Sequence, residues 1–205
     1  MLQSVYRVGA MALLREGLLE GRVIAAAGLS EELAAGLRRL GAEVRRLDAE
    51  AALEGIEEQV GEWARAKGPL HALVCDTRPV FGPGGRAALL RSQEQAWIAT
   101  REVAVGALIP GAGPGRIILI APQPDAGTLA GAARAGLENL ARTLSVEWAR
   151  FDVTVVALAP GAATSEAHVA DLVSFVCSPA GGYFSGCRIE LGVCSSSNPT
   201  PPRAR

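Results

Sequence analysis

The sequence predicts a single doubly wound α/β domain, in which a mostly parallel sheet of about six strands carries helices on both faces. Short, almost continuously apolar runs alternate along the chain with longer segments of helical periodicity, which is typical of βα units. Strands that are apolar on both sides belong to a sheet covered on each face. A chain of 205 residues is long enough for one domain with a sizeable core.

The individual elements follow from these patterns. The expected strands cover residues 22–27, 43–48, 71–75, 116–120, 153–158 and 188–191. Ser30 is expected to cap the first helix, with Glu31 and Glu32 in its first turn. A Gly/Pro loop is expected at 81–85, and further helices through Leu53–Trp63 and at 86–108, 127–150 and 166–177.

The α/β domain is expected to span residues 17–192, between an N-terminal extension (1–16) and a C-terminal tail (193–205). The tail, "CSSSNPTPPRAR", is polar and proline-rich, so we expect it to be disordered unless a partner orders it. We read the N-terminus as mature protein, because no convincing signal-peptide cleavage site follows its apolar run.

The composition gives no support to several classes of function. With 20% charged residues and a net charge of −1, no charged face dominates that could bind nucleic acid or a membrane surface. The apolar runs are too short to cross a bilayer, so we expect a cytoplasmic protein. The four cysteines, Cys75, Cys177, Cys187 and Cys194, form no CxxC pair and have no histidine at metal-ligand spacing. We therefore expect free thiols and no metal site.

Five stretches of the chain resemble the short-chain dehydrogenase/reductase family. They are "LLEGRVIAAAG", "GRIILIAP", "ARAGLENLARTLSVEWA", "VTVVALAPG" and "VADLVSFVCSPAGGYFSGCRIELG", which match in order over most of residues 17–192. The resemblance implies a Rossmann sheet, and members of the family are usually NAD(P)-dependent oxidoreductases that form dimers or tetramers. It does not by itself imply that this chain keeps the family's site residues.

The cofactor pattern of the family is incomplete in this chain. The family has Thr-Gly-x-x-x-Gly-x-Gly after its first strand, so that the backbone and a helix N-terminus can hold the pyrophosphate. Here Gly28 remains, the next glycine is Gly36, and Glu31 and Glu32 lie where the phosphates would be. One helix–strand unit is also missing, and Asp48 could stand for either the ribose-binding or the adenine-binding acid. We therefore expect this chain to bind no NAD.

The catalytic set of the family is absent as well. The family uses a Tyr, a Lys four residues later, a Ser and an Asn. Ala130 stands at the Tyr position and Arg134 at the Lys position. The only tyrosines are Tyr6 and Tyr183 and the only lysine is Lys67, so Tyr-x-x-x-Lys occurs nowhere in the chain.

The Ser and Asn roles are empty too, because no serine lies between Ser92 and Ser145 and the first asparagine is Asn139. Halohydrin dehalogenases, a branch of the same fold without nucleotide, use Ser, Tyr and an Arg at the Lys position. Without the Ser and Tyr, Arg134 has nothing to activate. A solvated or interface arginine is the simpler interpretation.

The sequence losses fall on functional segments: the phosphate loop, the adenosine unit and the substrate lid. The helices at 86–109 and 127–150 stay long and amphipathic, and in the family these helices pair between subunits. An apolar face formed by Leu129, Ala133, Leu137 and Leu140 suits such packing, although these residues could also face their own sheet.

The sequence therefore predicts a non-catalytic subunit that assembles with a catalytically complete, NAD-binding relative into a heterodimer or heterotetramer. It resembles the inactive subunit of 2-[hydroxy(phenyl)methyl]succinyl-CoA dehydrogenase, an enzyme of anaerobic aromatic degradation, although no residue identifies that substrate. Two alternatives stay open: a cofactor-free enzyme of the halohydrin-dehalogenase type that uses Arg134, and a stand-alone binding or regulatory protein.

Overall fold

The structure, a computed structural model, describes residues 14–47, 56–67, 69–82, 84–111 and 113–192. Its sheet contains six parallel strands, as the sequence predicts, and their order is β2-β1-β3-β4-β5-β6. The strands are β1 (Val23–Ala27), β2 (Glu43–Leu47), β3 (Ala72–Asp76), β4 (Gly115–Ile120), β5 (Val153–Pro160) and β6 (Cys187–Leu191). Each expected strand is confirmed to within two residues at either end.

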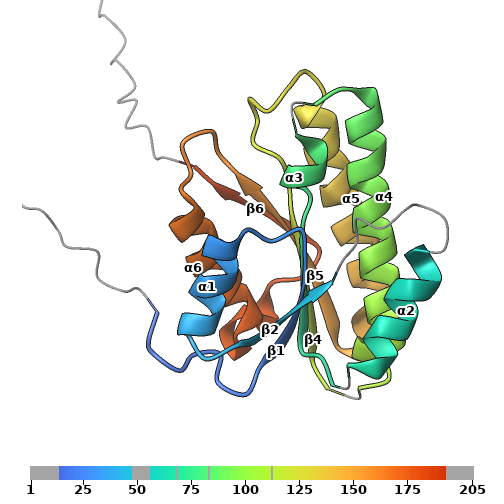
Figure 1. The fold of residues 1–205 in the computed structure, drawn as a ribbon, viewed down its shortest axis with the longest axis vertical. Helices are drawn as coiled ribbons and strands as arrows, with labels where there is room; N and C mark the ends of the chain where they lie inside the picture. The colour runs from blue at the N-terminus through green and yellow to red at the C-terminus, as the bar shows by residue number, and fades with distance from the viewer. Residues whose placement is uncertain (1–13, 48–55, 68, 83, 112, 193–205) are drawn as a thin grey trace, which may run out of the picture.

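Helices cover both faces of the sheet (Figure 1). On one face lie α1 (Glu31–Arg39) and α6 (Glu166–Cys177), whose leucine and valine side chains pack on Ile24 and Ile118. On the other lie α2 (Ile56–Ala66), α4 (Arg86–Val103) and α5 (Ala130–Trp148), which pack on Leu73 and Ile117. Successive side chains of a strand point to opposite faces, as Ile117 and Ile118 of β4 do, so the two faces of the sheet carry separate apolar layers.

The sequence analysis missed some of the short helical elements and included others in the longer helices that it predicted. α3 (Arg78–Phe81) begins before the expected loop, with Pro79 in its first turn, where a missing N–H costs nothing. α4 continues as a π-helical segment, η1 (Ala104–Leu108). The 3₁₀ elements η2 (Ala149–Phe151) and η3 (Pro179–Tyr183) follow α5 and α6. The expected domain boundaries, extension and tail lie partly outside the described residues and stay predictions.

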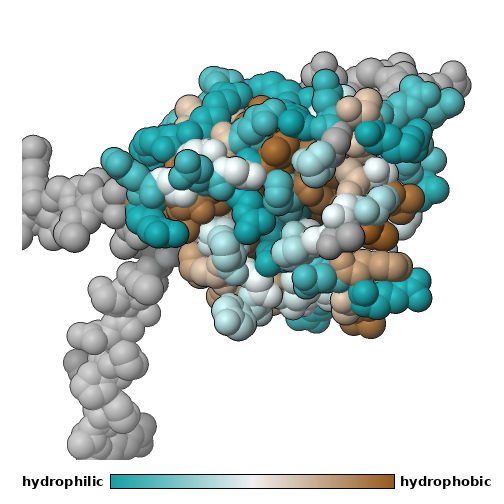
Figure 2. All heavy atoms as spheres, turned by 90° about the horizontal axis from the view of Figure 1, so that it is seen from below, coloured by the Kyte–Doolittle hydropathy of each residue, from teal (hydrophilic) through white to brown (hydrophobic). Residues whose placement is uncertain are grey.

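The surface seen from below in Figure 1 is mixed, with small groups of apolar side chains between hydrophilic ones (Figure 2). Larger exposed apolar side chains occur on the outer helices, among them Leu90, Trp97 and Val146 on α4 and α5. No helix among the described residues is long and apolar enough to cross a membrane.

The cysteines give a first prediction. Cys75, Cys177 and Cys187 are free thiols, as expected. Burial raises the pKa of Cys75 and of Cys177 to about 12 each. At pH 8 iodoacetamide should therefore label Cys187 in the native protein well before Cys75 or Cys177, as peptide mass spectrometry would show. Labelling of all three at similar rates without denaturant would contradict this packing.

Candidate functional site

The carboxyl edge of the sheet between β1 and β3 is where a doubly wound fold places its ligand site. β1 pairs with β2 on one side and with β3 on the other, so the chain changes direction across the sheet at this point. The structure brings the sequence-predicted residues Gly28, Glu31 and Glu32 to this edge, in the turn after β1 and the first turn of α1.

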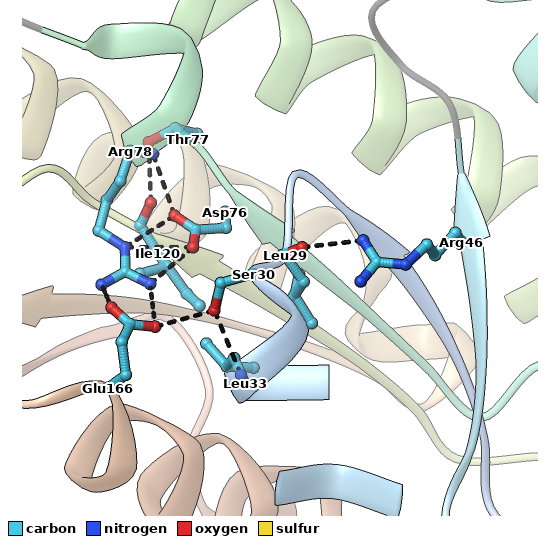
Figure 3. Close-up of polar contacts among 9 residues, drawn as sticks. All are labelled: Leu29, Ser30, Leu33, Arg46, Asp76, Thr77, Arg78, Ile120 and Glu166. Carbon is cyan, nitrogen blue, oxygen red and sulfur yellow. Dashed lines mark hydrogen bonds and ion pairs between the residues drawn. The ribbon is translucent and has the colours of Figure 1, made fainter. Parts of the chain in front are cut away.

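A cluster of polar side chains occupies this edge, and we call Ser30, Asp76, Arg78 and Glu166 the Arg78 cluster (Figure 3). Arg78 donates from Nε to both carboxylate oxygens of Asp76, at 2.9 and 3.1 Å, and from Nη2 to Oδ2 at 2.7 Å. It also donates from Nη1 and Nη2 to the two oxygens of Glu166, at 2.5 and 3.0 Å. One guanidinium therefore binds two carboxylates bidentately and joins the end of β3 to the start of α6.

The cluster lies largely out of water. The Asp76 side chain is 1% exposed and that of Arg78 is 15% exposed. Burial raises the pKa of Asp76, and the hydrogen bonds from Arg78 oppose that shift. Burial alone would lower the pKa of Arg78, but its hydrogen bonds with Asp76 and Glu166 raise it above the usual value. The charge of each partner is offset by the other, so neither is buried without a counter-charge.

Ser30 connects the cluster to the N-terminus of α1. Its hydroxyl accepts from the amide of Leu33 at 3.2 Å, which confirms the expected cap, and donates to Glu166 Oε2 at 3.2 Å. The Glu166 carboxylate thus lies beside the positive end of the α1 dipole. On the outer side of α1, Arg46 donates to the Leu29 carbonyl at 2.9 Å and to Glu31 at 2.5 Å.

Gly28 holds the turn after β1 against the end of β3. Its φ of +72° lies in the left-handed region, and a Cβ added there would lie 2.3 Å from the Asp76 carbonyl oxygen. Only glycine fits this close approach. In the family pattern this glycine lies against the cofactor. In this chain it allows the turn after β1 to lie against the end of β3.

The catalytic position of the family is filled by apolar packing. Ala130, at the family's Tyr position, is fully buried and lies in one cluster with Phe81 and Ala133, which are also fully buried. Phe81 is the last residue of α3, and the sequence analysis took it as the first residue of a loop. A phenyl ring therefore packs where the resemblance would place a phenol and its substrate.

The expectation that Arg134 is a solvated arginine is wrong, and the interface alternative stays a prediction. Its side chain is only 12% exposed. Nη1 donates to the carbonyls of Pro122 and Pro160, both at 2.8 Å, and Nη2 to that of Ala159 at 3.4 Å. Burial lowers the pKa of Arg134. The guanidinium joins the segment that follows β4 to the last two residues of β5, which is a structural role.

The remaining candidate residues lie apart from this edge or outside the described residues. Tyr183 is 93% exposed on η3, and Lys67 is exposed just after α2. Asp48 and Tyr6 lie outside the described residues, so their expected roles are not tested. Within the described ranges, no group of three His, Cys, Asp or Glu side chains could hold a metal ion.

The predicted helix–helix face on α5 is only partly correct. Ala133 and Leu137 are fully buried against the molecule's own core, and Leu129 and Leu140 are half-buried. The outward side of α4 and α5 instead presents a groove between the two helices, lined in part by Gln93, Trp97, Asn139, Leu140 and Thr143. The shift follows from the helical period, because positions four apart along α5 face the sheet.

Solved structures of similar architecture are dehydrogenases and reductases. A citronellol catabolism dehydrogenase from Pseudomonas aeruginosa has a TM-score of 0.67 and 22% identity, over 87% of this chain and 96% of that chain. A short-chain dehydrogenase/reductase variant from Serratia marcescens has 0.66 and 22%, over 85% and 97%. The enoyl-acyl carrier protein reductase of Bacillus cereus, solved with NADP+, has 0.65 and 15%, over 87% and 100%.

The chain has the fold of these oxidoreductases. The identities are too low to carry an activity from any of them to this chain. Comparison of the sequence with protein-family models and with curated proteins finds no match.

The sequence analysis missed the Arg78 cluster. It named none of Asp76, Arg78 and Glu166 as a site residue. The sequence does contain a signal for this cluster, the Asp-x-Arg at the carboxyl end of an otherwise apolar strand. Charged side chains at the end of a buried strand need either water or a partner of opposite charge, and here they can pair with each other.

Proposed function

We propose that this chain is a non-catalytic subunit of the short-chain dehydrogenase type, which assembles with a catalytically complete relative that binds NAD and oxidises a hydroxyl group. The observation that carries the proposal is the Arg78 cluster at the switch point of the sheet. In a working Rossmann site this space must accept a pyrophosphate, whose charge the helix N-terminus favours.

The residues at this edge do not fit a dinucleotide. Glu166 already lies at the start of α1, bound through Ser30, and Asp76 and Glu31 add two more carboxylates around it. Arg78 is the cation best placed to hold a phosphate, and both of its terminal nitrogens bind carboxylates. A dinucleotide would have to displace Glu166 from Arg78 and separate Gly28 from Asp76.

The α4–α5 face supports assembly. Leu90, Trp97 and Val146 are 59%, 42% and 78% exposed on neighbouring helices, and the groove beside Trp97 has a volume of about 480 Å³. Large aromatic side chains next to grooves are typical anchors of protein interfaces. The halohydrin-dehalogenase alternative loses support, because the Arg134 guanidinium binds three backbone carbonyls. The suggestion of a hydroxyacyl-CoA as the partner's substrate rests on resemblance alone.

The first test is the native mass of the tagged protein isolated from its source cells, with NAD binding measured on the same sample. We expect a stoichiometric dehydrogenase partner that carries the Tyr-x-x-x-Lys pair, with NAD bound only in that partner. A homo-oligomer that binds NAD or turns over a substrate without a partner would overturn the proposal. A monomer without partner or activity would favour a stand-alone binding protein.

Trp97→Asp tests the assigned interface. Because it places a charge at an aromatic anchor, we expect it to weaken the complex about 30-fold or more in a titration of purified subunits. Tyr183→Asp is the matched control, since Tyr183 is more exposed but lies on η3. Equal loss in both variants would show that the α4–α5 face is not the specific interface.

A further inference from the structure

A second groove runs along the outer side of α6, and we call it the α6 groove. It has a volume of about 520 Å³, and its lining includes His168, Asp171, Leu172 and Phe175 of α6. These positions follow the helical period, so they form one face of the helix. Leu191, at the end of β6, completes an apolar wall. An apolar groove of this size on a surface is a typical binding site for another segment of chain.

Both ends of the described chain lie in this groove. Leu14 and Gly192 each contribute to its lining. Residues 1–13 therefore join the fold at one part of the rim, and residues 193–205 at another. Leu14 also packs against the apolar layer beneath α6. Two segments of thirteen residues are thus tethered to the groove, and each is a candidate occupant.

The chemistry of the two segments favours the first. Of residues 1–13, "MLQSVYRVGAMAL", nine are apolar, whereas residues 193–205, "VCSSSNPTPPRAR", contain three apolar residues and three prolines. An apolar groove is stabilised by covering its apolar surface, which the polar segment cannot do.

Charge agrees with this choice. Asp171 is the only acidic residue in the lining, is half-buried, and forms no hydrogen bond or ion pair with another described side chain. Arg7 is the only charged residue of the first segment. Arginines also occur in the C-terminal segment, so the apolar content decides between the two and the charge is a supporting argument.

We propose that residues 1–13 bind in the α6 groove of their own chain. The tether makes even a weak contact sufficient. A short linker gives an effective concentration on the order of 1 mM, so an intrinsic Kd of about 0.1 mM would keep the segment bound about nine-tenths of the time. This intrachain contact covers α6 and is independent of the proposed α4–α5 interface.

Limited trypsin cleavage after Arg7 tests the proposal, with the release of residues 1–7 followed by intact mass. If the segment binds in the groove, cleavage in the full chain should be about tenfold slower than at the same bond of a synthetic peptide of residues 1–13. Equal rates in protein and peptide would overturn the proposal. So would protection that disappears on dilution, because it would place the segment of a second copy in the groove.

Two variants locate the contact. Leu172→Glu puts a charge in the groove and should restore rapid cleavage after Arg7, whereas Val146→Glu, at a 78% exposed position on α5, should leave the protection unchanged. Val5→Asp, in the segment itself, should also restore rapid cleavage after Arg7. Protection that survives both Leu172→Glu and Val5→Asp would place the segment elsewhere and overturn the proposal.

Discussion

Arg78→Met is expected to lower the free energy of unfolding by about 3–5 kcal/mol, which is the usual cost of leaving a buried charge without its partner. Asp76 is 1% exposed, and its carboxylate would keep only the backbone amide of Arg78 as a hydrogen-bond donor among the described residues. Glu166, which is 30% exposed, can turn to water and should contribute less to the loss. Urea denaturation followed by circular dichroism would measure the change.

A more exposed pair provides the control for Arg78→Met. Arg142 binds Glu138 at 2.7 Å across one turn of α5, but the Arg142 side chain is 64% exposed. Arg142→Met should therefore cost only about 0–1 kcal/mol. A similar effect in both variants would mean that the Arg78 cluster is solvated and does not hold β3 and α6 together.

The double variant Asp76→Leu/Arg78→Met separates the cost of an unpaired charge from the loss of packing. Replacing a buried ion pair by apolar side chains is often neutral or stabilising. The double variant should therefore recover most of the stability that Arg78→Met loses. If instead the two substitutions destabilise additively, Asp76 and Arg78 are not energetically coupled, and the loss in Arg78→Met comes from packing or from the contact with Glu166 and not from an unpaired Asp76.

The fold could be predicted from the sequence because each of its signals is local. A run such as "RIILI" is apolar at every position, and it becomes β4 with all six of its strand residues buried. Ser30 followed by Glu31 and Glu32 specifies the start of α1 without reference to the rest of the chain. The order of the six strands is not set locally: right-handed βα connections fix the face on which each helix packs, but not that β1 lies between β2 and β3.

The candidate site could be predicted only in part, because its contacts join residues far apart in sequence. Arg78 and Glu166 are 88 positions apart, and Ser30 and Glu166 are 136 apart. No local pattern specifies such pairs, so a family comparison could show which residues were lost but not which contacts replaced them. Arg134 illustrates the same limit, because its carbonyl partners come from two segments outside α5: Pro122 after β4, and Ala159 and Pro160 at the end of β5.

Gly28→Ala is the second substitution expected to have a large effect. A Cβ at this position meets the Asp76 carbonyl oxygen at 2.3 Å, and the residue must also keep a φ of +72°. The left-handed conformation alone costs a non-glycine residue about 1–2 kcal/mol. The contact with backbone adds to this, because a carbonyl at the end of β3 cannot move without disturbing the Arg78 cluster beside it. We expect a total loss of about 3 kcal/mol or more in urea denaturation.

Gly21→Ala isolates the backbone contribution. Gly21 has a φ of +74°, almost that of Gly28, but nothing lies within 4 Å of a Cβ added there. This variant should show the conformational cost alone, about 1–2 kcal/mol. The difference between the two variants then measures how tightly the turn after β1 is held against β3. Equal losses in the two variants would mean that the turn after β1 can move away from the end of β3. Such a movement could make room for a phosphate at this edge, which would count against the proposal of a non-catalytic subunit.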